Sequence, residues 1–308
     1  MKLSIVATLY QSASHIVEFH ARTTATAREF AGDDYELILV NDGSPDNSLD
    51  VAVELIKRDS HVIVVDLSRN FGHHKAMMTG LANTKGDSVF LIDSDLEERP
   101  EYLLEFSAKK EAEACDVVYG VQNQRKGRTF ERLSGKFFWW FFNLITGMNL
   151  PANIATVRLM SRRYVDSLVS HQEREIFMAG LWHITGFNQV PIPINKISSG
   201  ATTYTFRKKM ALLINSVTSF SNAPLVSIFY LGMIISLVAF FYILYLIGHW
   251  TFLDRPVSGW TSVMASIWML GGLLMSSVGI VGIYLSKIFS ETKQRPYTII
   301  RKIYKETC

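Results

Sequence analysis

The sequence predicts an α/β fold, with a mainly parallel sheet covered by helices on both faces and a two-helix transmembrane hairpin after it. Two observations support this prediction. Apolar runs alternate with segments of helical pattern over the first part of the chain, which is typical of a parallel sheet. Two long uncharged runs then follow near the end of the 308 residues, each long enough to cross a bilayer.

Five apolar runs are candidate strands: "LSIVATL" at 3–9, "ELILVND" at 36–42, "VIVVDL" at 62–67, "SVFLID" at 88–93 and "DVVYGV" at 116–121. Candidate helices with polar faces lie between them, near 13–31, 46–58, 73–84 and 101–114. Ligands of such sheets bind at the edge where the strands end. Neither G-x-G-x-x-G nor G-x-x-x-x-G-K-[ST] occurs, so a dinucleotide cofactor or a P-loop is not supported.

The two uncharged runs, 224–248 and 260–286, predict membrane spans. They raise the mean hydropathy to +0.16, and soluble cores rarely contain two such runs in succession. Basic residues flank the pair on both outer sides, whereas the connection "HWTFLDRPVSG" has one Arg and one Asp. The positive-inside rule therefore places both termini and the region before the spans in the cytoplasm, with the protein in the cell inner membrane.

Composition divides the chain into four parts. Residues 1–206 form a catalytic-sized domain, 207–222 an interfacial helix, 223–286 the two spans, and 287–308 a basic tail. Apolar residues of the second part recur at helical spacing behind three basic residues, which suits an anionic membrane surface; a helix facing a soluble core is the alternative. Small residues in the second span favour close packing, against the first span or in a homo-oligomer.

Charge and cysteine usage exclude several classes. The net charge of +3 gives no reason to expect a nucleic acid partner. Cys115 and Cys308 have no motif spacing, so neither a disulfide framework nor a zinc site is expected. The opening "MKLSIVATLY" is too short an apolar run for a signal peptide.

The stretch "FLIDSDLEERPE" at 90–101 suggests the chemistry. An apolar strand ends in Asp93 and Asp95, whose carboxylates repel each other unless a cation lies between them. Mg²⁺ and Mn²⁺ take oxygen ligands and bind through one or two carboxylates plus substrate phosphates. The pair therefore predicts a metal–diphosphate site, suited to a nucleoside-diphosphate leaving group. A solvated acidic turn is the alternative.

Other polar residues near the strand ends have simpler explanations. Asp42 lies in an Asn-Asp-Gly-Ser sequence that could be only a turn. His73 and His74 lack the spacing of a metal pair, and the start of a helix explains them. Glu97 and Glu98 are interpreted as first-turn acids of the next helix, where its dipole favours them.

Four stretches in this order carry a resemblance: "VNDGS", "SRNFGHHKAMMTGL", "GDSVFLIDSDLEERPE" and "VRLMSR", followed by two spans. Together they resemble the family 2 glycosyltransferases, and within them the polyprenyl-phosphate branch that includes bactoprenol glucosyltransferases and dolichol-phosphate mannose synthases. The resemblance covers nearly the whole chain. It implies a GT-A type, Rossmann-like fold and transfer of a sugar, with inversion, from a nucleotide sugar to a polyprenyl phosphate. A UDP-sugar is favoured as the donor.

The resemblance also implies roles for particular residues. Asp42 would contact the nucleotide base, Asp93 and Asp95 would hold metal, ribose and diphosphate, and Asp95 would be the more direct metal ligand. The acceptor phosphate would be held by basic and hydroxyl side chains, namely Arg132, Ser134, Arg158 and Arg207, of which Arg132 and Arg158 also lie near the reacting groups. The remaining donor-side residues are Tyr10, Arg69 and Asn70.

Three departures from the family pattern bear on the reaction. The first strand ends in Thr8-Leu9-Tyr10-Gln11-Ser12, where the family has Pro-x-Tyr-Asn-Glu, and the downstream family Lys is replaced within 200–204. Thr156 replaces the Asp proposed as general base. A sugar hydroxyl usually needs such a base, whereas a phosphate monoester has a second pKa of about 6 and is largely ionised at pH 7. A lipid-phosphate acceptor therefore tolerates Thr156.

Two other functions remain open. If the acceptor is a hydroxyl of a lipid-linked saccharide, Glu173 or Glu175 in "HQEREIF" could replace the missing base. The other hypothesis is a degenerate, non-catalytic assembly partner, suggested by Ser12 and Thr156. A phosphatase is disfavoured, because no carboxylate occurs in 8–12 at the end of the first strand.

Overall fold

The computed structural model describes residues 1–122, 139–148, 150–151, 153–196, 213–215, 217–252 and 259–306. The chain forms two compact units. The sheet unit comprises Met1–Phe141, Met148–Thr205 and Arg295–Cys308, and the hairpin unit comprises Phe142–Gly147 and Phe206–Gln294.

The described part of the sheet unit contains one mixed sheet in the order β7-β5-β6-β4-β1-β2-β3-β8. Its strands are β1 (Leu3–Leu9), β2 (Tyr35–Asn41), β3 (Val62–Leu67), β4 (Ser88–Leu91), β5 (Val117–Gln122), β6 (Ile154–Ser161), β7 (Gln189–Ile194) and β8 (Ile300–Tyr304). Strands β4, β1, β2 and β3 are parallel, as are β5 and β7. Strands β6 and β8 run antiparallel to their neighbours.

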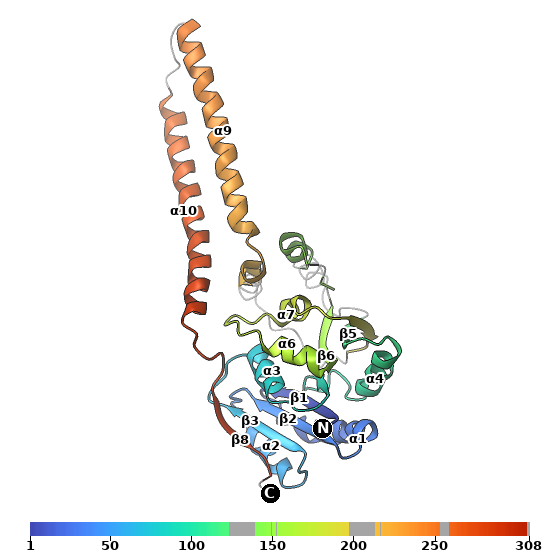
Figure 1. Cartoon of the computed structure of the whole chain (residues 1–308). Coiled ribbons are helices and arrows are strands. Elements are labelled where there is room, and N and C mark those ends of the chain that lie inside the picture. Colours follow the sequence, from blue (N-terminus) through green and yellow to red (C-terminus); the bar gives the residue numbers. More distant parts are fainter. Residues whose placement is uncertain are drawn as a thin grey trace. The chain divides into compact units, whose positions relative to one another are not determined.

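Helices cover both faces of this sheet (Figure 1). They are α1 (Ile16–Ala31), α2 (Ser48–Ile56), α3 (His73–Ala82), α4 (Tyr102–Ala112), α6 (Arg162–Val169) and α7 (Met178–Ile184). Alternate residues of a strand point to opposite faces, so the fully buried strand β1 serves two cores. Its Leu3, Ile5 and Leu9 join the core formed with α1, α2 and α4. On the other face, a Cβ at Gly80 of α3 would lie 2.4 Å from Val6 Cγ1, so the helix and the sheet approach closely there.

The five predicted strands and the α/β class are confirmed. Strands β6, β7 and β8 were not predicted, and β8 lies within the basic tail expected at 287–308. In its "IRKIY" sequence basic side chains interrupt the apolar ones, and the strand is short and mostly exposed. Strand β8 pairs with β3, which lies more than 230 residues earlier in the sequence, and the contact between Arg301 and Ser68 joins the two segments. In Figure 1 the red strand β8 lies along the blue strand β3.

The hairpin unit contains helices α9 (Ala223–Phe252) and α10 (Trp260–Thr292), which lie side by side (Figure 1). Each contains a segment long and apolar enough to cross a membrane, Ala223–Tyr242 and Ser266–Thr292, and neither segment is buried within the protein. The predicted spans at 224–248 and 260–286 fall within these helices. Of the predicted interfacial helix, the described residues 213–215 and 217–220 are helical.

Candidate active site

The polar residues of the sheet unit gather at one edge of its sheet. Strands β1, β2, β3 and β4 are parallel, so their carboxyl ends share this edge. Because β6 is antiparallel to β4, its amino end lies there too. Strand β7 is parallel to β5, and β5 is antiparallel to β6, so β7 also ends there. This is the edge where ligands bind in open α/β sheets.

Two loops on the β2–β3 side of this edge are joined by Asp42. Its buried carboxylate accepts hydrogen bonds from the backbone N–H groups of Phe71 and Gly72, at 2.7 and 3.0 Å. Burial raises the pKa of Asp42, and these two bonds oppose the shift. The next residue, Gly43, has φ +58°, and a Cβ there would lie 2.4 Å from the backbone N of Asn70. We call residues 41–44 and 68–72 the donor-side loops.

The carboxylate of Asp42, which the resemblance assigned to the nucleotide base, bonds the two loops to each other, and its contact with a base stays a prediction. The other predicted donor-side residues are exposed at this edge. Tyr10 is 49% exposed just after β1, and Asn70 is exposed beside Arg69. The Arg69 guanidinium lies over the Phe71 ring, 4.1 Å from its centroid. These side chains are accessible to a ligand.

The acidic loop after β4 is tied to β1 by Ser94. The Ser94 hydroxyl donates to the Thr8 carbonyl at 2.7 Å. Ser94 is buried, and it lies between Asp93 and Asp95 in the sequence. Asp95 Oδ1 accepts from the backbone N–H of Glu97 at 2.9 Å. Burial, followed by the neighbouring charge of Asp93, raises the pKa of Asp95. The loop thus holds the predicted carboxylate pair next to each other at the edge.

His73 provides a cationic partner for Asp93. Its Nε2 lies 3.3 Å from Asp93 Oδ1, while its Nδ1 lies 2.9 Å from the Thr8 hydroxyl. Burial by itself would lower the pKa of His73, but the charge of Asp93 outweighs it and the pKa is raised. Burial would raise the pKa of Asp93, and His73 reverses this shift, so the pKa is lowered. The helix-start explanation of His73 is therefore incomplete, because the side chain also contacts the acidic loop.

Glu97 and Glu98 correct another interpretation. Helix α4 begins at Tyr102, and these two acids turn toward Lys196, whose Nζ lies 3.0 Å from Glu97 Oε2 and 3.8 Å from Glu98 Oε1. Glu98 is fully buried and accepts from the Thr156 N–H at 3.2 Å. Burial, followed by the charge of Asp93, raises the pKa of Glu98 to about 8. Burial by itself would lower the pKa of Lys196, but the nearby carboxylates outweigh it and the pKa is raised.

Lys196 was missed because β7 was missed. The sequence "QVPIPI" contains two prolines, which usually argue against a strand, but β7 lies at the edge of the sheet, where proline is tolerated. Had that strand been recognised, a lysine two residues beyond its carboxyl end would have been a candidate.

Strand β6 brings Thr156 and Arg158 to the site in different environments. Leu91 pairs with Arg158, and continuing this register places Thr156 opposite Asp93, where its hydroxyl favours the ionised carboxylate. Arg158 is 1% exposed, with its guanidinium carbon 3.0 Å from the centroid of the Trp182 ring. Burial lowers the pKa of Arg158 to about 9, so it stays charged at pH 7. In this structure Arg158 is not open to the acceptor phosphate that the sequence assigned to it.

The remaining predicted acceptor residues, Arg132, Ser134 and Arg207, lie outside the described residues. Of the alternative bases, Glu175 is exposed and Glu173 is half-buried. Their segment reaches the site edge, because the next residue, Ile176, contacts His74 Nδ1 through its carbonyl at 3.1 Å.

The donor set fits a hard divalent cation. Within the described part of the chain, no group of three or more His, Cys, Asp or Glu side chains could hold a metal. The pair Asp93 and Asp95 remains; Asp93 Oδ1 accepts no hydrogen bond among the described residues, and its charged neighbour there is His73, at 3.3 Å. A cation that draws its other ligands from a diphosphate needs only one or two carboxylates. Both Asp93 and Asp95 are half-buried at this edge.

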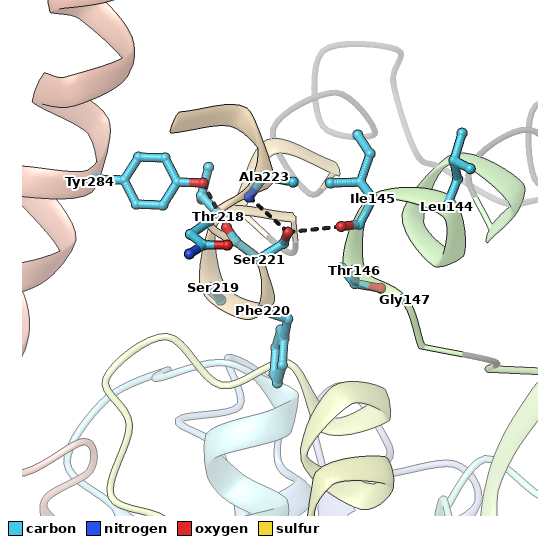
Figure 2. A pocket seen from close by; sticks show the side chains of 11 residues that line it. Leu144, Ile145, Thr146, Gly147, Thr218, Ser219, Phe220, Ser221, Ala223 and Tyr284 are labelled. Atoms are coloured by element: carbon cyan, nitrogen blue, oxygen red, sulfur yellow. Dashed lines mark hydrogen bonds between the residues drawn. The ribbon is translucent and has the colours of Figure 1, made fainter. Parts of the chain in front are cut away.

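A hollow with a volume of about 710 Å³ lies within the hairpin unit. Residues 144–147 and 218–223 line it together with Tyr284 of α10 (Figure 2). Ser221 holds its parts together: its hydroxyl donates to the Ile145 carbonyl at 2.8 Å, and its own carbonyl accepts from Tyr284 at 2.7 Å. Its lining combines apolar side chains with hydroxyls already bonded to backbone carbonyls.

The sequence matches Glycosyl transferase family 2 over residues 4–168. A Mycobacterium tuberculosis relative, named only at the level of glycosyltransferases, is 53% identical over 99% of this chain and 89% of its own length. An Escherichia coli relative named as a prophage bactoprenol glucosyl transferase homolog is 31% identical over 99% of this chain and 100% of its own. The chain belongs to glycosyl transferase family 2.

Among solved structures, mannosyl-3-phosphoglycerate synthase from Rubrobacter xylanophilus matches with a TM-score of 0.48 and 18% identity, covering 70% of this chain and 72% of that one. A similarity at this level carries no inference about ligands.

Proposed function

We propose that this protein transfers a sugar, with inversion, from a nucleotide-diphosphate sugar to a membrane polyprenyl phosphate. The observation that carries the proposal is the acidic pair Asp93 and Asp95 at the sheet edge of a family 2 chain whose hairpin unit could cross a membrane. The relatives named as bactoprenol glucosyl transferases support the acceptor class. A UDP-sugar is the donor that we favour, and the product would serve cell-surface glycan synthesis or modification.

The donor would lie along the edge between the donor-side loops and the acidic loop. Tyr10, Arg69 and Asn70 present exposed side chains to its nucleoside half. Asp93 and Asp95 would hold Mg²⁺ or Mn²⁺, and the metal would neutralise the charge that develops on the leaving diphosphate. His73 forms an ion pair with Asp93, and Lys196 forms one with Glu97, so each cation orients an acid of this loop in the absence of substrate. Preorganised charge of this kind supplies much of the acceleration in transferases.

The acceptor does not require a protein base if it is a phosphate monoester. Thr156 replaces the expected acid and cannot remove a proton at neutral pH. A lipid phosphate is largely dianionic at pH 7, with a second pKa of about 6, so direct displacement at the anomeric carbon needs only positioning. We propose that Arg132, Ser134 and Arg207 hold this phosphate. The buried Arg158 contributes positive charge through the protein interior.

The hairpin unit would hold the isoprenoid chain in the bilayer. Helices α9 and α10 would span the inner membrane, with both termini cytoplasmic by the positive-inside rule. The hollow around Ser221 lies where α9 begins, and its mixed lining of hydroxyl and apolar side chains could hold the polar end of the lipid and the first units of its isoprenoid. Assembly into a homo-oligomer through α10 stays a prediction.

The test is to incubate the purified full-length protein with undecaprenyl phosphate and a panel of UDP-, GDP- and dTDP-sugars, with and without EDTA. We expect a lipid-linked sugar that mild acid releases and that EDTA abolishes, because a sugar phosphate is labile whereas a glycosidic bond mostly survives. Asp95→Asn is the inactive control.

Transfer to a hydroxyl is the second candidate, favoured by the position of Glu175 one residue before the Ile176 contact with His74. Lipid-linked saccharide acceptors are therefore included in the panel, and an acid-stable product would support this function. If the parent protein shows no turnover with any donor or acceptor, the non-catalytic alternative gains.

A further inference from the structure

Strand β8 is placed where it can act on the donor-side loops. It pairs with β3, and the register is interrupted between Asp66 and Leu67, immediately before the loop that contains Arg69. Such bulges often lie next to functional sites, where they redirect side chains. Strand β8 follows α10 in the sequence. Because it pairs with β3, it brings the C-terminal segment next to a loop of the candidate active site.

Arg301 of β8 makes two contacts at this bulge. One guanidinium nitrogen lies 3.3 Å from Asp66 Oδ2, and the other donates to the Ser68 carbonyl at 2.6 Å. The Ser68 N–H in turn donates to the Ile299 carbonyl at 2.9 Å. Both backbone polar groups of Ser68, the first residue of a donor-side loop, are therefore bonded to the C-terminal segment.

Asp66 extends this contact to the other donor-side loop. Its carboxylate is 1% exposed, and Oδ1 accepts from the Asn41 amide at 2.8 Å. The Asn41 side-chain oxygen accepts from the Ser44 N–H at 3.2 Å, which closes the turn that contains Asp42. A continuous set of hydrogen bonds therefore runs from Arg301 through Asp66 to residues 41–44.

The two loops cannot move independently of each other. Asp42 binds the N–H groups of Phe71 and Gly72, and Gly43 packs directly against the backbone at Asn70. A displacement at residues 66–68 is therefore transmitted to both loops, because no space separates them.

We propose that Arg301 is a positioning residue for the donor nucleotide: it fixes the donor-side loops through Asp66 and Ser68. This inference rests on the proposed function, because it takes these loops as the binding place of the donor's nucleoside half. Arg301 itself is half exposed and need not touch the ligand. Its guanidinium suits the role because its planar fork can serve two acceptors at once, which an ammonium does less well.

The test measures nucleotide affinity in the full-length protein in detergent micelles. UDP, GDP and dTDP are titrated by calorimetry into the parent, and the tightest is then titrated into Arg301→Gln, Arg301→Lys and Lys305→Gln. Lys305 is an exposed residue just past β8, so Lys305→Gln removes the same charge without touching Asp66. We expect Arg301→Gln to weaken binding about tenfold, since it removes two charge-assisted hydrogen bonds, and Arg301→Lys to recover part of the loss. Lys305→Gln should match the parent.

Two further readouts separate positioning from a general loss of structure. In Arg301→Gln the KM for the nucleotide sugar should rise about tenfold while kcat and the acceptor KM stay within about twofold. Hydrogen exchange should become faster in peptides covering 41–44 and 68–72 and stay unchanged in 3–9. Parent-like affinity in Arg301→Gln, or a fall in kcat alone, would overturn the inference while leaving the proposed function intact. If the parent binds no nucleotide, the proposed function itself fails, and the inference fails with it.

Discussion

Gly43 offers a sharp test of the donor-side loops, through the substitution Gly43→Ala. The residue has φ +58°, where an L-residue costs about 1–2 kcal/mol. The added Cβ would also lie 2.4 Å from the Asn70 N and 2.5 Å from the Arg69 carbonyl carbon. Ordinary contact begins at 3.4 Å, so the difference from 2.4 Å requires a displacement of 1.0 Å. Backbone atoms must supply that movement, because no flexible side chain is involved.

Gly32 provides a matched control for the strain alone. It has φ +64° at the end of α1, and nothing lies within 4 Å of the position that its Cβ would occupy. Its ψ of −131° lies outside the left-handed helical region, in backbone space populated mainly by glycine, so Gly32→Ala should lower the free energy of unfolding by about 1–3 kcal/mol and leave nucleotide affinity unchanged. Gly43→Ala should add about 1–3 kcal/mol for overpacking, and it should weaken nucleotide binding about 10- to 100-fold, because misplacement by about 1 Å has effects of that size.

The assay combines thermal unfolding with calorimetric titration of the nucleotide that the parent binds. The difference between the two variants in unfolding free energy and in nucleotide affinity separates the effect of the close contact between the loops from the cost of a positive φ. Equal affinity in Gly43→Ala and the parent would show that the loops do not form the nucleotide site. An equal loss of affinity in Gly32→Ala would show that strain, and not the contact, is responsible.

Three further outcomes are expected. Asp95→Asn should lower sugar transfer about 100-fold or more without lowering the melting temperature, measured by product formation and thermal shift; undiminished turnover would refute the metal assignment. Lys196→Met should destabilise the protein by about 1–2 kcal/mol, because it removes the cation next to Glu97, and a calorimetric scan that shows no loss would contradict this role. Burial by itself would raise the pKa of Asp116, but hydrogen bonding to Arg163 outweighs it and the pKa is lowered. The pair therefore stabilises the folded protein above the unfolded pKa of about 3.9, and this stability is lost as the pH falls through the folded pKa. The melting temperature of Arg163→Gln should therefore lie below that of the parent at pH 7 and approach it as the pH falls through the lowered pKa of Asp116; a gap independent of pH would exclude the pair as its source.

The sequence was sufficient for the fold class and the family. The apolar runs of β1 to β4 are continuous because these strands are buried on both faces along nearly their whole length, and this pattern is readable without any tertiary information. The acidic pair Asp93 and Asp95 was recognisable for a similar reason, since the preceding strand and the carboxylates are adjacent in the chain. The hairpin helices were equally evident, because their uncharged length is a local property.

The partners of the acidic pair could not be predicted, because they come from distant segments. His73 follows β3, Lys196 follows β7, and Glu98 belongs to a turn that composition assigned to a helix start. Each was individually unremarkable in sequence. Arg158 illustrates the opposite case, since its motif was clear but its burial against Trp182 depends on α7 packing over β6.

The sequence alone thus determined strands β1 to β5, the two hairpin helices and the positions of the carboxylates, because hydrophobic periodicity and strand-end chemistry are encoded by neighbouring residues. Tertiary structure alone decided which charges meet at the sheet edge, whether Arg158 is exposed, and that the last strand of the chain lies beside β3. These outcomes depend on strand order and register, and the contacts that set them join residues as far apart as Arg301 and Asp66.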